Sequence, residues 1–154
     1  MAKQEKLTVA VLKKRLDVLL RSIRYMGSED GIHNVCATCK KEFLISELQC
    51  GHFIKRGNMV LKYEPRNMMP QCRRCNHFLD GAQDKAAKFV IDVHGLDCFN
   101  DFIETDYKWL NGELKTIGKK EYVEYYNLWL NATRAIEKKF DIKIIPGTWE
   151  PVTL

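Results

Sequence analysis

The stretch that decides the fold is bounded by two Cys-x-x-Cys pairs, Cys36-Ala-Thr-Cys39 and Cys72-Arg-Arg-Cys75, with residues 40–71 between them. Structural zinc takes four tetrahedral ligands, and a two-residue gap lets one tight turn aim both thiolates of a pair at the same ion. Four thiolates leave no position for water, so such a site folds the chain rather than catalyses. A redox dithiol or a chance pairing is the alternative. We interpret the four cysteines as ligands of one structural Zn²⁺.

The composition is that of a soluble globular protein, with 45% hydrophobic and 29% charged residues among 154. No apolar run approaches the roughly 20 residues that span a bilayer, so no membrane partner is expected. The basic N-terminus lacks the long apolar stretch and the cleavage site of a secretory signal, which predicts a cytoplasmic location. Because disulfides belong mainly to exported chains, the six cysteines favour metal binding over three disulfides.

Positive charge is concentrated beside the second pair. The formal net charge is +5, and the only acid between Lys55 and Arg74 is Glu64. The basic residues of that stretch are Lys55, Arg56, Lys62, Arg66, Arg73 and Arg74. A patch of one sign favours a polyanionic partner, whereas a solvated surface usually mixes both signs.

Apolar spacing predicts four helices. They cover residues 7–26, the stretch from Asn76 to a C-cap at Gly95, and residues 96–110 and 119–140. Between the cysteine pairs we expect a short irregular or extended segment after Cys39 and then a strand and turn over 50–57. Two prolines in residues 64–72 predict an ordered loop there, and residues 28–34 also read as a loop.

Polar residues between and after the pairs form a second pattern. Gly51-His52-Phe53 is followed by Asn67, five residues before Cys72, and Asn76-His77 directly follows Cys75. This order resembles the HNH motif in its double Cys-x-x-Cys version. The closer resemblance is to the phage recombination endonuclease NinG (Rap) family, and phage endonuclease VII is a more distant relative. The carriers are CATC (36–39), CGHFIKRG (50–57), RNMMPQCRRCN (66–76) and the Asp-Gly of FLDG (80–81).

The resemblance covers roughly residues 10–95 and implies an α+β, mainly helical fold. A small zinc-centred ββα-metal (HNH) core over 35–95 would be clasped by an N-terminal helix and loop, 1–34, and a C-terminal helical extension, 96–154, in one compact unit. The implied activity is metal-dependent endonuclease cleavage of DNA, on branched or recombination-intermediate substrates, in a phage-infected or lysogenic bacterial host.

The resemblance also assigns roles. Phosphodiester hydrolysis needs a base for water and a cation for the scissile phosphate. The family pattern gives the base to His52, a ligand of the catalytic Mg²⁺ or Mn²⁺ to Asn76, and the bracing of the intervening loop to Asn67. Many HNH proteins carry a metal-binding Asp where this chain has Gly51. Asp80 is the candidate replacement, because on a helix starting at Asn76 it would lie at i+4 on the same face.

Two alternatives for that missing ligand stay open: Asp80 as a plain turn residue before Gly81, and Glu47 as a weaker candidate ligand. For DNA contacts we expect backbone rather than base recognition, since no segment resembles a major-groove recognition helix. The residues predicted to bind DNA are Lys55, Arg56, Arg73, Arg74 and His77. Symmetric cleavage of four-way junctions would require a homodimer, for which the aromatic segment Tyr122–Trp129 is the nominated interface.

Two readings of another class compete with the nuclease. A non-catalytic zinc-stabilised DNA-binding module would need the cysteine pairs and the basic patch alone. A zinc-braced protein-interaction domain would make the basic charge incidental. His52, Asn67 and Asn76 in register are what favour an enzyme.

Overall fold

The computed structural model describes residues 7–154 and divides the chain into two compact units. One unit combines the described residues up to Leu20 with Ile117–Leu154, and the other is the continuous stretch Arg21–Thr116. The boundaries therefore differ from those predicted at 34/35 and 95/96, because the two ends of the chain share one unit and residues 96–116 belong to the cysteine-bearing one. The first six residues of the predicted segment 1–34 lie outside the described residues.

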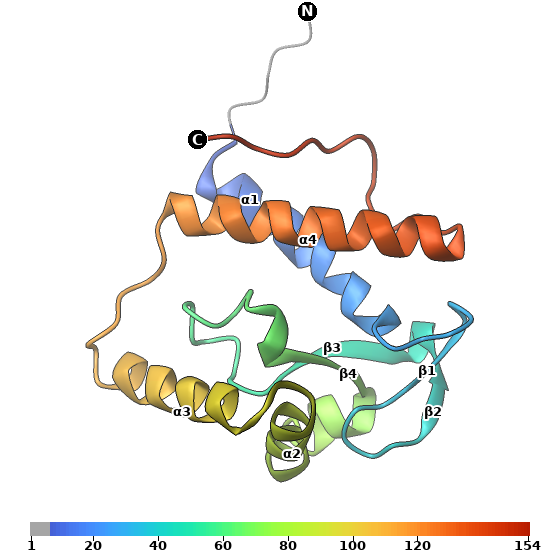
Figure 1. Cartoon of the computed structure of the whole chain (residues 1–154), viewed down its shortest axis with the longest axis horizontal. Coiled ribbons are helices and arrows are strands. Elements are labelled where there is room, and N and C mark those ends of the chain that lie inside the picture. The colour runs from blue at the N-terminus through green and yellow to red at the C-terminus, as the bar shows by residue number, and fades with distance from the viewer. Residues whose placement is uncertain (1–6) are drawn as a thin grey trace, which may run out of the picture. The chain divides into compact units, whose positions relative to one another are not determined.

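The first unit is built on two packed helices, α1 (Val9–Leu19) and α4 (Lys119–Phe140) (Figure 1). The Thr8 hydroxyl accepts a hydrogen bond from the backbone N–H of Val11 and caps α1, whose last turns tighten into a 3₁₀ helix over Leu20–Tyr25. The buried face of α1 consists of Leu12, Leu16 and Leu19. The buried face of α4 consists of Tyr122, Val123, Tyr126, Trp129, Leu130 and Thr133.

The predicted interface segment Tyr122–Trp129 is thus mostly interior. Tyr122, Tyr126 and Trp129 are at most 3% exposed, so they cannot form the surface of a dimer without unpacking this unit. The amphipathic pattern predicted the helix correctly. An aromatic stripe at helical spacing does not, however, distinguish packing on another helix of the same chain from packing on a second copy of the chain. The C-terminal tail returns along α4, where the Asn127 side chain exchanges two hydrogen bonds of 2.8 Å with the backbone of Val152.

The second unit contains two antiparallel two-stranded sheets. Strand β1 (His33–Val35) pairs with β2 (Glu42–Leu44), and β3 (Leu48–His52) pairs with β4 (Met68–Cys72). A 3₁₀ turn over Ile45–Glu47 precedes β3. The loop predicted for 28–34 ends in β1, and the strand predicted to begin at Cys50 begins at Leu48.

Strand β4 corrects the prediction of a loop over 64–72. A 3₁₀ turn covers only Pro65–Asn67, and the residues after it are paired with β3. The N–H of Phe53 donates to the carbonyl of Asn67, and bonded and non-bonded pairs alternate along an antiparallel ladder. Pro70, opposite Cys50, therefore occupies a non-hydrogen-bonded position, where its missing N–H costs the ladder nothing.

The segment after the second cysteine pair corrects the prediction of a helix from Asn76. Arg74–Phe78 form a single π-helical turn, and α2 begins only at Gln83 and ends at His94. Between them Asp80, Gly81 and Ala82 all have positive φ angles of 49°, 86° and 47°. Three left-handed residues cannot continue a right-handed helix, so the chain reverses there. Gly95, with φ 92°, ends α2 as predicted, and α3 (Leu96–Leu110) follows at once.

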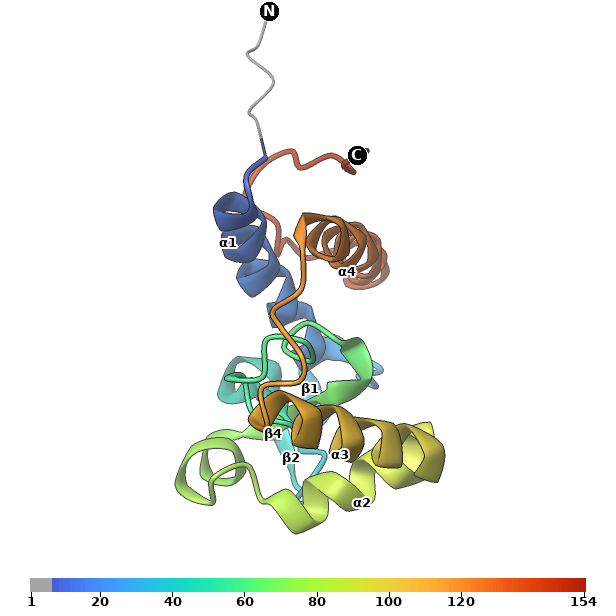
Figure 2. The same cartoon turned by 90° about the vertical axis from the view of Figure 1, so that its left-hand side faces the viewer.

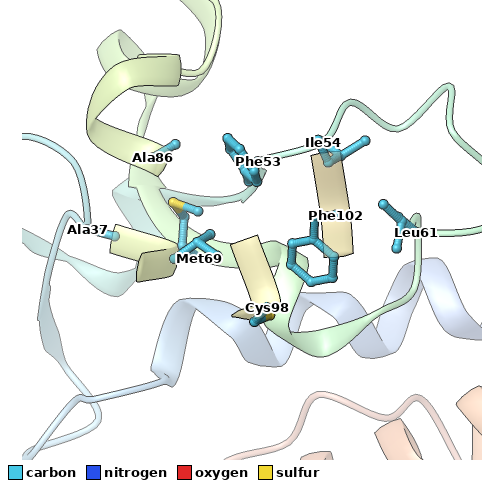
Figure 3. Close-up of a cluster of buried hydrophobic side chains, with 9 residues drawn as sticks. Ala37, Phe53, Ile54, Leu61, Met69, Ala86, Cys98 and Phe102 are labelled. Atoms are coloured by element: carbon cyan, nitrogen blue, oxygen red, sulfur yellow. The ribbon is translucent and has the colours of Figure 1, made fainter. Parts of the chain in front are cut away.

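Helices α2 and α3 pack against each other and carry one side of the core of this unit (Figure 2). The core joins side chains from the first cysteine pair, the segment that follows β3, strand β4 and both helices (Figure 3). Its buried members are Ala37, Phe53, Ile54, Leu61, Met69, Ala86, Val90, Cys98 and Phe102. The fold class is α+β with helices predominating, as predicted. Within residues 7–154, no helix combines the length and the apolar character that crossing a membrane requires.

Candidate functional site

The two cysteine pairs form one four-sulfur cluster that could hold a metal ion. The Sγ atoms of Cys36, Cys39, Cys72 and Cys75 all lie within 4.8 Å of one another, and those of Cys39 and Cys72 are 3.9 Å apart. Four sulfurs about 2.3 Å from one zinc ion at tetrahedral angles lie about 3.8 Å apart. The geometry and the donor set are consistent with a structural zinc. Among the described residues this is the one group of such side chains arranged for a metal.

Local backbone bonds shape the first pair. Lys40, with φ 62°, lets the chain turn so that its N–H donates to the carbonyl of Cys36 at 2.9 Å. The sulfur of Cys36 lies 3.3 Å from both the backbone N of Cys72 and the Thr38 hydroxyl. Burial opposes the ionisation of Cys36, but backbone N–H groups of both pairs and the Thr38 hydroxyl donate to its sulfur and together lower its pKa to about 6. Cys36 is therefore the cysteine most ready to present a thiolate, whereas burial raises the pKa of Cys39 and raises that of Cys75 to about 12.

A separate hollow of about 320 Å³ brings together five of the predicted site residues. We call it the His52 hollow. Its lining consists of Cys50, His52, Lys55, Arg56, Gly57, Asn76, Asp80, Gly81 and Gln83. Strand β3, the loop that follows it, the π-helical turn and the left-handed turn before α2 each contribute. The predicted base, both predicted ligands of the catalytic cation and two predicted phosphate-binding residues therefore share one concave surface.

His52 is held in a defined orientation and tautomer. Its ring is only 8% exposed, and its Nε2 lies 2.9 Å from the carbonyl oxygen of Lys62. A carbonyl can only accept, so Nε2 carries the proton and the lone pair of the neutral ring is on Nδ1. A backbone acceptor on the far nitrogen also increases the basicity of the near one. The bond to Lys62 therefore fixes the orientation of the His52 ring beside the hollow.

Asn67 lies outside the hollow and is completely buried. Its Oδ1 accepts from the backbone N–H of Ile54 at 2.7 Å, and its Nδ2 donates to the carbonyls of Ile54 at 3.0 Å and Leu61 at 3.1 Å. These bonds tie the chain that follows His52 to the start of β4. Because no substrate can reach it, Asn67 can act only by positioning this loop.

Asn76, in the π-helical turn, and Asp80, in the left-handed turn that follows, both line the His52 hollow. Asn76 donates through Nδ2 to Oε1 of Gln49 at 2.9 Å, which leaves Oδ1 as its possible cation ligand. Asp80 lies in the left-handed turn rather than one helical turn beyond Asn76, and its carboxylate pairs with Lys55 at 2.9 Å. Both partners of this ion pair are mostly exposed, so the pair is weak and can exchange.

Glu47, the weaker candidate ligand from the sequence, and the additional cysteine Cys50 lie in different surroundings. Glu47 lines another hollow, and its carboxylate accepts from the backbone N–H of Leu44 at 3.0 Å, so it does not replace the Asp missing at position 51. Cys50 lines the His52 hollow but lies outside the four-sulfur cluster. Burial raises the pKa of Cys50 to about 12 against the opposing influence of Arg56 and Arg24, which keeps it a neutral thiol.

The space beside Gly51 explains why no carboxylate stands there. A Cβ at Gly51 would lie 2.0 Å from Oε1 and 2.5 Å from Cδ of Gln71. Gln71 is fully buried, and its Nε2 donates to the carbonyl of Gly81 at 2.9 Å and the Thr38 hydroxyl at 3.4 Å. Gln71 therefore connects the first cysteine pair to the turn that carries Asp80. Sequence reasoning missed this residue, and nothing in the local pattern marks it.

Substitution of Gly51 by Ala should destabilise the protein by about 1–3 kcal/mol, the usual cost of overpacking a filled interior. Gly57→Ala is the matched control, because a Cβ there would meet nothing within 4 Å. Urea unfolding of the metal-loaded protein measures both. Gln71→Ala should relieve part of the loss when combined with Gly51→Ala. Equal stability of the two single Ala variants would contradict the close approach of Gln71.

The remaining predicted DNA-binding residues lie elsewhere. Arg73 and Arg74 line a second hollow of about 580 Å³ beside the cysteine cluster, which we call the knuckle hollow. Its lining consists of Cys39, Lys41, Phe43, Ser46, Glu47, Gln49, Cys72, Arg73, Arg74, Cys75, Leu79 and Lys85. His77 is exposed and lines neither hollow, its ring meeting Phe78 edge-on at 5.3 Å. Of the six basic residues that the sequence groups together, two line each hollow, whereas Lys62 and Arg66 line neither.

Comparison with known proteins assigns the chain to no family. No protein-family model, no curated protein and no solved structure matches the chain. What the site does is therefore argued from the residues that line it.

Proposed function

We propose that this chain is a metal-dependent DNA endonuclease of the HNH kind, with a Cys₄ structural zinc and with branched DNA as its substrate class. The observation that carries the proposal is the His52 hollow, where a histidine of fixed tautomer faces the same space as Asn76, Asp80 and two basic side chains. The motif resemblance to the NinG (Rap) family supports it independently of the geometry. A hollow lined by these groups has what phosphodiester hydrolysis needs: a base, oxygen ligands and phosphate-binding cations.

In the proposed mechanism, His52 is the general base. Held at Nε2 by the Lys62 carbonyl, it accepts the proton of a water molecule as that water attacks the scissile phosphorus. The bond to the 3′ oxygen breaks as the bond to the water oxygen forms. Because the ring is held by a backbone group, its orientation does not depend on the substrate.

Asn76 and Asp80 would hold the divalent cation, Mg²⁺ or Mn²⁺, through Oδ1 and a carboxylate oxygen. When bound, that cation supplies charge stabilisation to the phosphate and the leaving oxygen. Lys55 is ion-paired with Asp80, so this pair must separate before Asp80 can bind the cation. Lys55 can then contact a phosphate together with Arg56. Asn67 acts by holding the loop that follows His52, and Gln71 acts by holding the turn that carries Asp80.

The structural zinc has a different task. Cys36, Cys39, Cys72 and Cys75 would saturate it, so it would fix β4 and the π-helical turn without touching substrate. Asn76 directly follows Cys75, and Gln71 directly precedes Cys72. Metal binding would thus fix the position of Asn76, which lines the His52 hollow, and of Gln71, which supports the turn that carries Asp80.

One observation favours the alternative of a non-catalytic DNA-binding module. Asp80 is the single carboxylate among the described residues that line the His52 hollow, and it is already paired with Lys55. A module that only binds DNA would have no need to release Asp80 from this pair. The two proposals differ in whether a divalent cation at this hollow has a function.

Incubation of the purified full chain with linear, flapped and four-way DNA of matched sequences tests the proposal. With Mg²⁺ or Mn²⁺ we expect cleavage of the branched substrates over the linear ones, with little dependence on the sequence around the branch. Gel analysis of end-labelled strands locates the cuts. DNA binding without cleavage in either metal would leave the non-catalytic module as the function. Strict preference for one linear sequence would refute the branched substrate.

A further inference from the structure

The knuckle hollow has the lining of a ligand site. Phe43, from β2, and Leu79, from the turn before α2, provide its apolar surface together with the edge of Cys39. Phe43 is half-buried, and Leu79 is 46% exposed. The volume of about 580 Å³ far exceeds the space for one ion between sulfurs that lie within 4.8 Å, so the hollow extends well beyond the metal cluster. It falls within the range of pockets that bind small organic groups.

Basic side chains outnumber acidic ones along the lining of this hollow, and they partly offset the net negative charge that four thiolates leave on a bound zinc ion. The basic side chains of the hollow are Lys41, Arg73, Arg74 and Lys85, and its single acid is Glu47, whose carboxylate is bound to the backbone of Leu44. They come from three separate segments, namely the residues between the first cysteine pair and β2, the second cysteine pair, and α2. A lining that combines apolar and cationic side chains is complementary to a group with one flat apolar part and an attached negative charge.

The knuckle hollow adjoins the His52 hollow. Gln49 lines the former and Asn76 the latter, and the two side chains are joined by a hydrogen bond of 2.9 Å. The two hollows therefore meet at this pair of side chains. A DNA strand with its scissile phosphate against His52 would place a neighbouring nucleotide at the knuckle hollow, whose lining includes Arg73 and Arg74.

The shape of the site selects an unpaired nucleotide. In a duplex both faces of each base are covered by the neighbouring bases. A protein that binds a duplex through its phosphate backbone therefore needs only a flat cationic surface. A concave site with an aromatic side chain can receive a base only when that base has left the stack. Every base has a flat face, so such a site would not depend strongly on sequence.

We propose that the knuckle hollow binds one unpaired nucleotide of branched DNA, with the base against Phe43 and Leu79 and the phosphate among the four basic side chains. This inference rests on the proposed function and specifies how it would distinguish a branch from a duplex. Phe43 and Leu79 are positioned as specificity residues, since neither lines the His52 hollow.

Fluorescence anisotropy with the full chain carrying His52→Ala, which prevents cleavage during binding, tests the inference. The probes are a duplex with a single-stranded branch, the same duplex without it, and the branched duplex with abasic sites at the nucleotides next to the junction. We expect Phe43→Ala to weaken binding of the branched probe about fivefold or more, the lower end for loss of one base–aromatic stack, and to leave the unbranched probe unchanged. Abasic sites should have the same effect, and combining them with Phe43→Ala should add no further loss.

Leu44→Ala is the matched control, because Leu44 is the next residue of β2, is 44% exposed and does not line the hollow. Zinc content and circular dichroism establish that each variant is folded. If Phe43→Ala loses its metal, Leu79→Ala decides, with a smaller loss expected on the branched probe only. Equal weakening of both probes, or full affinity for the abasic branch, would overturn the inference.

Failure of this inference is distinct from failure of the proposed function. Metal-dependent cleavage by the wild-type chain, together with an unchanged branch preference in Phe43→Ala and Leu79→Ala, would reject the nucleotide site alone. Absence of binding to any DNA probe would reject both.

Discussion

Replacement of Cys72 by Ser is expected to leave the unit Arg21–Thr116 without a stable fold. Cys72 ends β4 opposite Leu48, and its backbone N–H also donates to the sulfur of Cys36. Zinc binding in small Cys-rich sites is worth roughly 10–16 kcal/mol, which exceeds the usual net stability of a domain. A hydroxyl in place of one thiolate removes much of that free energy, so β4 and the π-helical turn lose their common anchor.

Elemental analysis and thermal unfolding followed by circular dichroism measure this effect. Protein purified without chelator should contain one zinc per chain, and the Cys72→Ser variant should contain little and lose its cooperative transition. Cys50→Ser is the matched control, because Cys50 lies in the paired strand but outside the four-sulfur cluster. A Cys72→Ser protein that retains zinc and the wild-type transition would refute the structural role of the cluster.

Replacement of His52 by Ala should reduce DNA cleavage by about 10²–10⁴-fold, the usual contribution of a positioned general base. The affinity for DNA should change little, because the proposed phosphate contacts belong to the basic side chains. The substitution removes the bond to the Lys62 carbonyl, and Asn67 still ties down the same loop.

Single-turnover cleavage and anisotropy on the same branched substrate separate the two effects. His33→Ala serves as control, because His33 is exposed in β1, pairs with Asp30 and lies outside the His52 hollow. Cleavage at the wild-type rate in His52→Ala would show that another group activates the water.

The parts of the fold that sequence predicted correctly are those encoded by local spacing. Helices over 96–110 and 119–140 have the predicted bounds, and Gly95 ends the helix before them. The four-cysteine cluster follows from two short motifs, each of which forms its own tight turn. In all of these cases the residues that decide the structure are within one or two turns of one another.

Features that depend on contacts between residues far apart in the sequence could not be predicted from local spacing. Strand β4 was hidden because Pro70 argues against a strand unless the partner and its register are known. The left-handed run 80–82 is supported by Gln71, ten residues earlier, through its bond to the Gly81 carbonyl. A helical apolar pattern after Asn76 gave no sign of it.

The candidate site shows the same division. The sequence named His52, Asn76 and Asp80, and the structure brings all three to one hollow. The reason given for Asp80 was wrong, because a left-handed turn and not a helix face places it there. Arg73 and Arg74 line a different hollow from Lys55 and Arg56, and this division depends on the tertiary fold, which sequence distance does not report.

The interleaving of the two units has a consequence for the order in which the chain can fold during synthesis. Arg21–Thr116 is continuous and has all of its core and metal ligands once Thr116 has left the ribosome. Helix α1 is made first but packs with α4, which is made last. At about 5–20 residues per second, translation of residues 21–116 takes roughly 5–20 s. For at least that time α1 lacks the helix that it packs against, so the nascent chain presents the apolar face of Leu12, Leu16 and Leu19, which a ribosome-associated chaperone can bind.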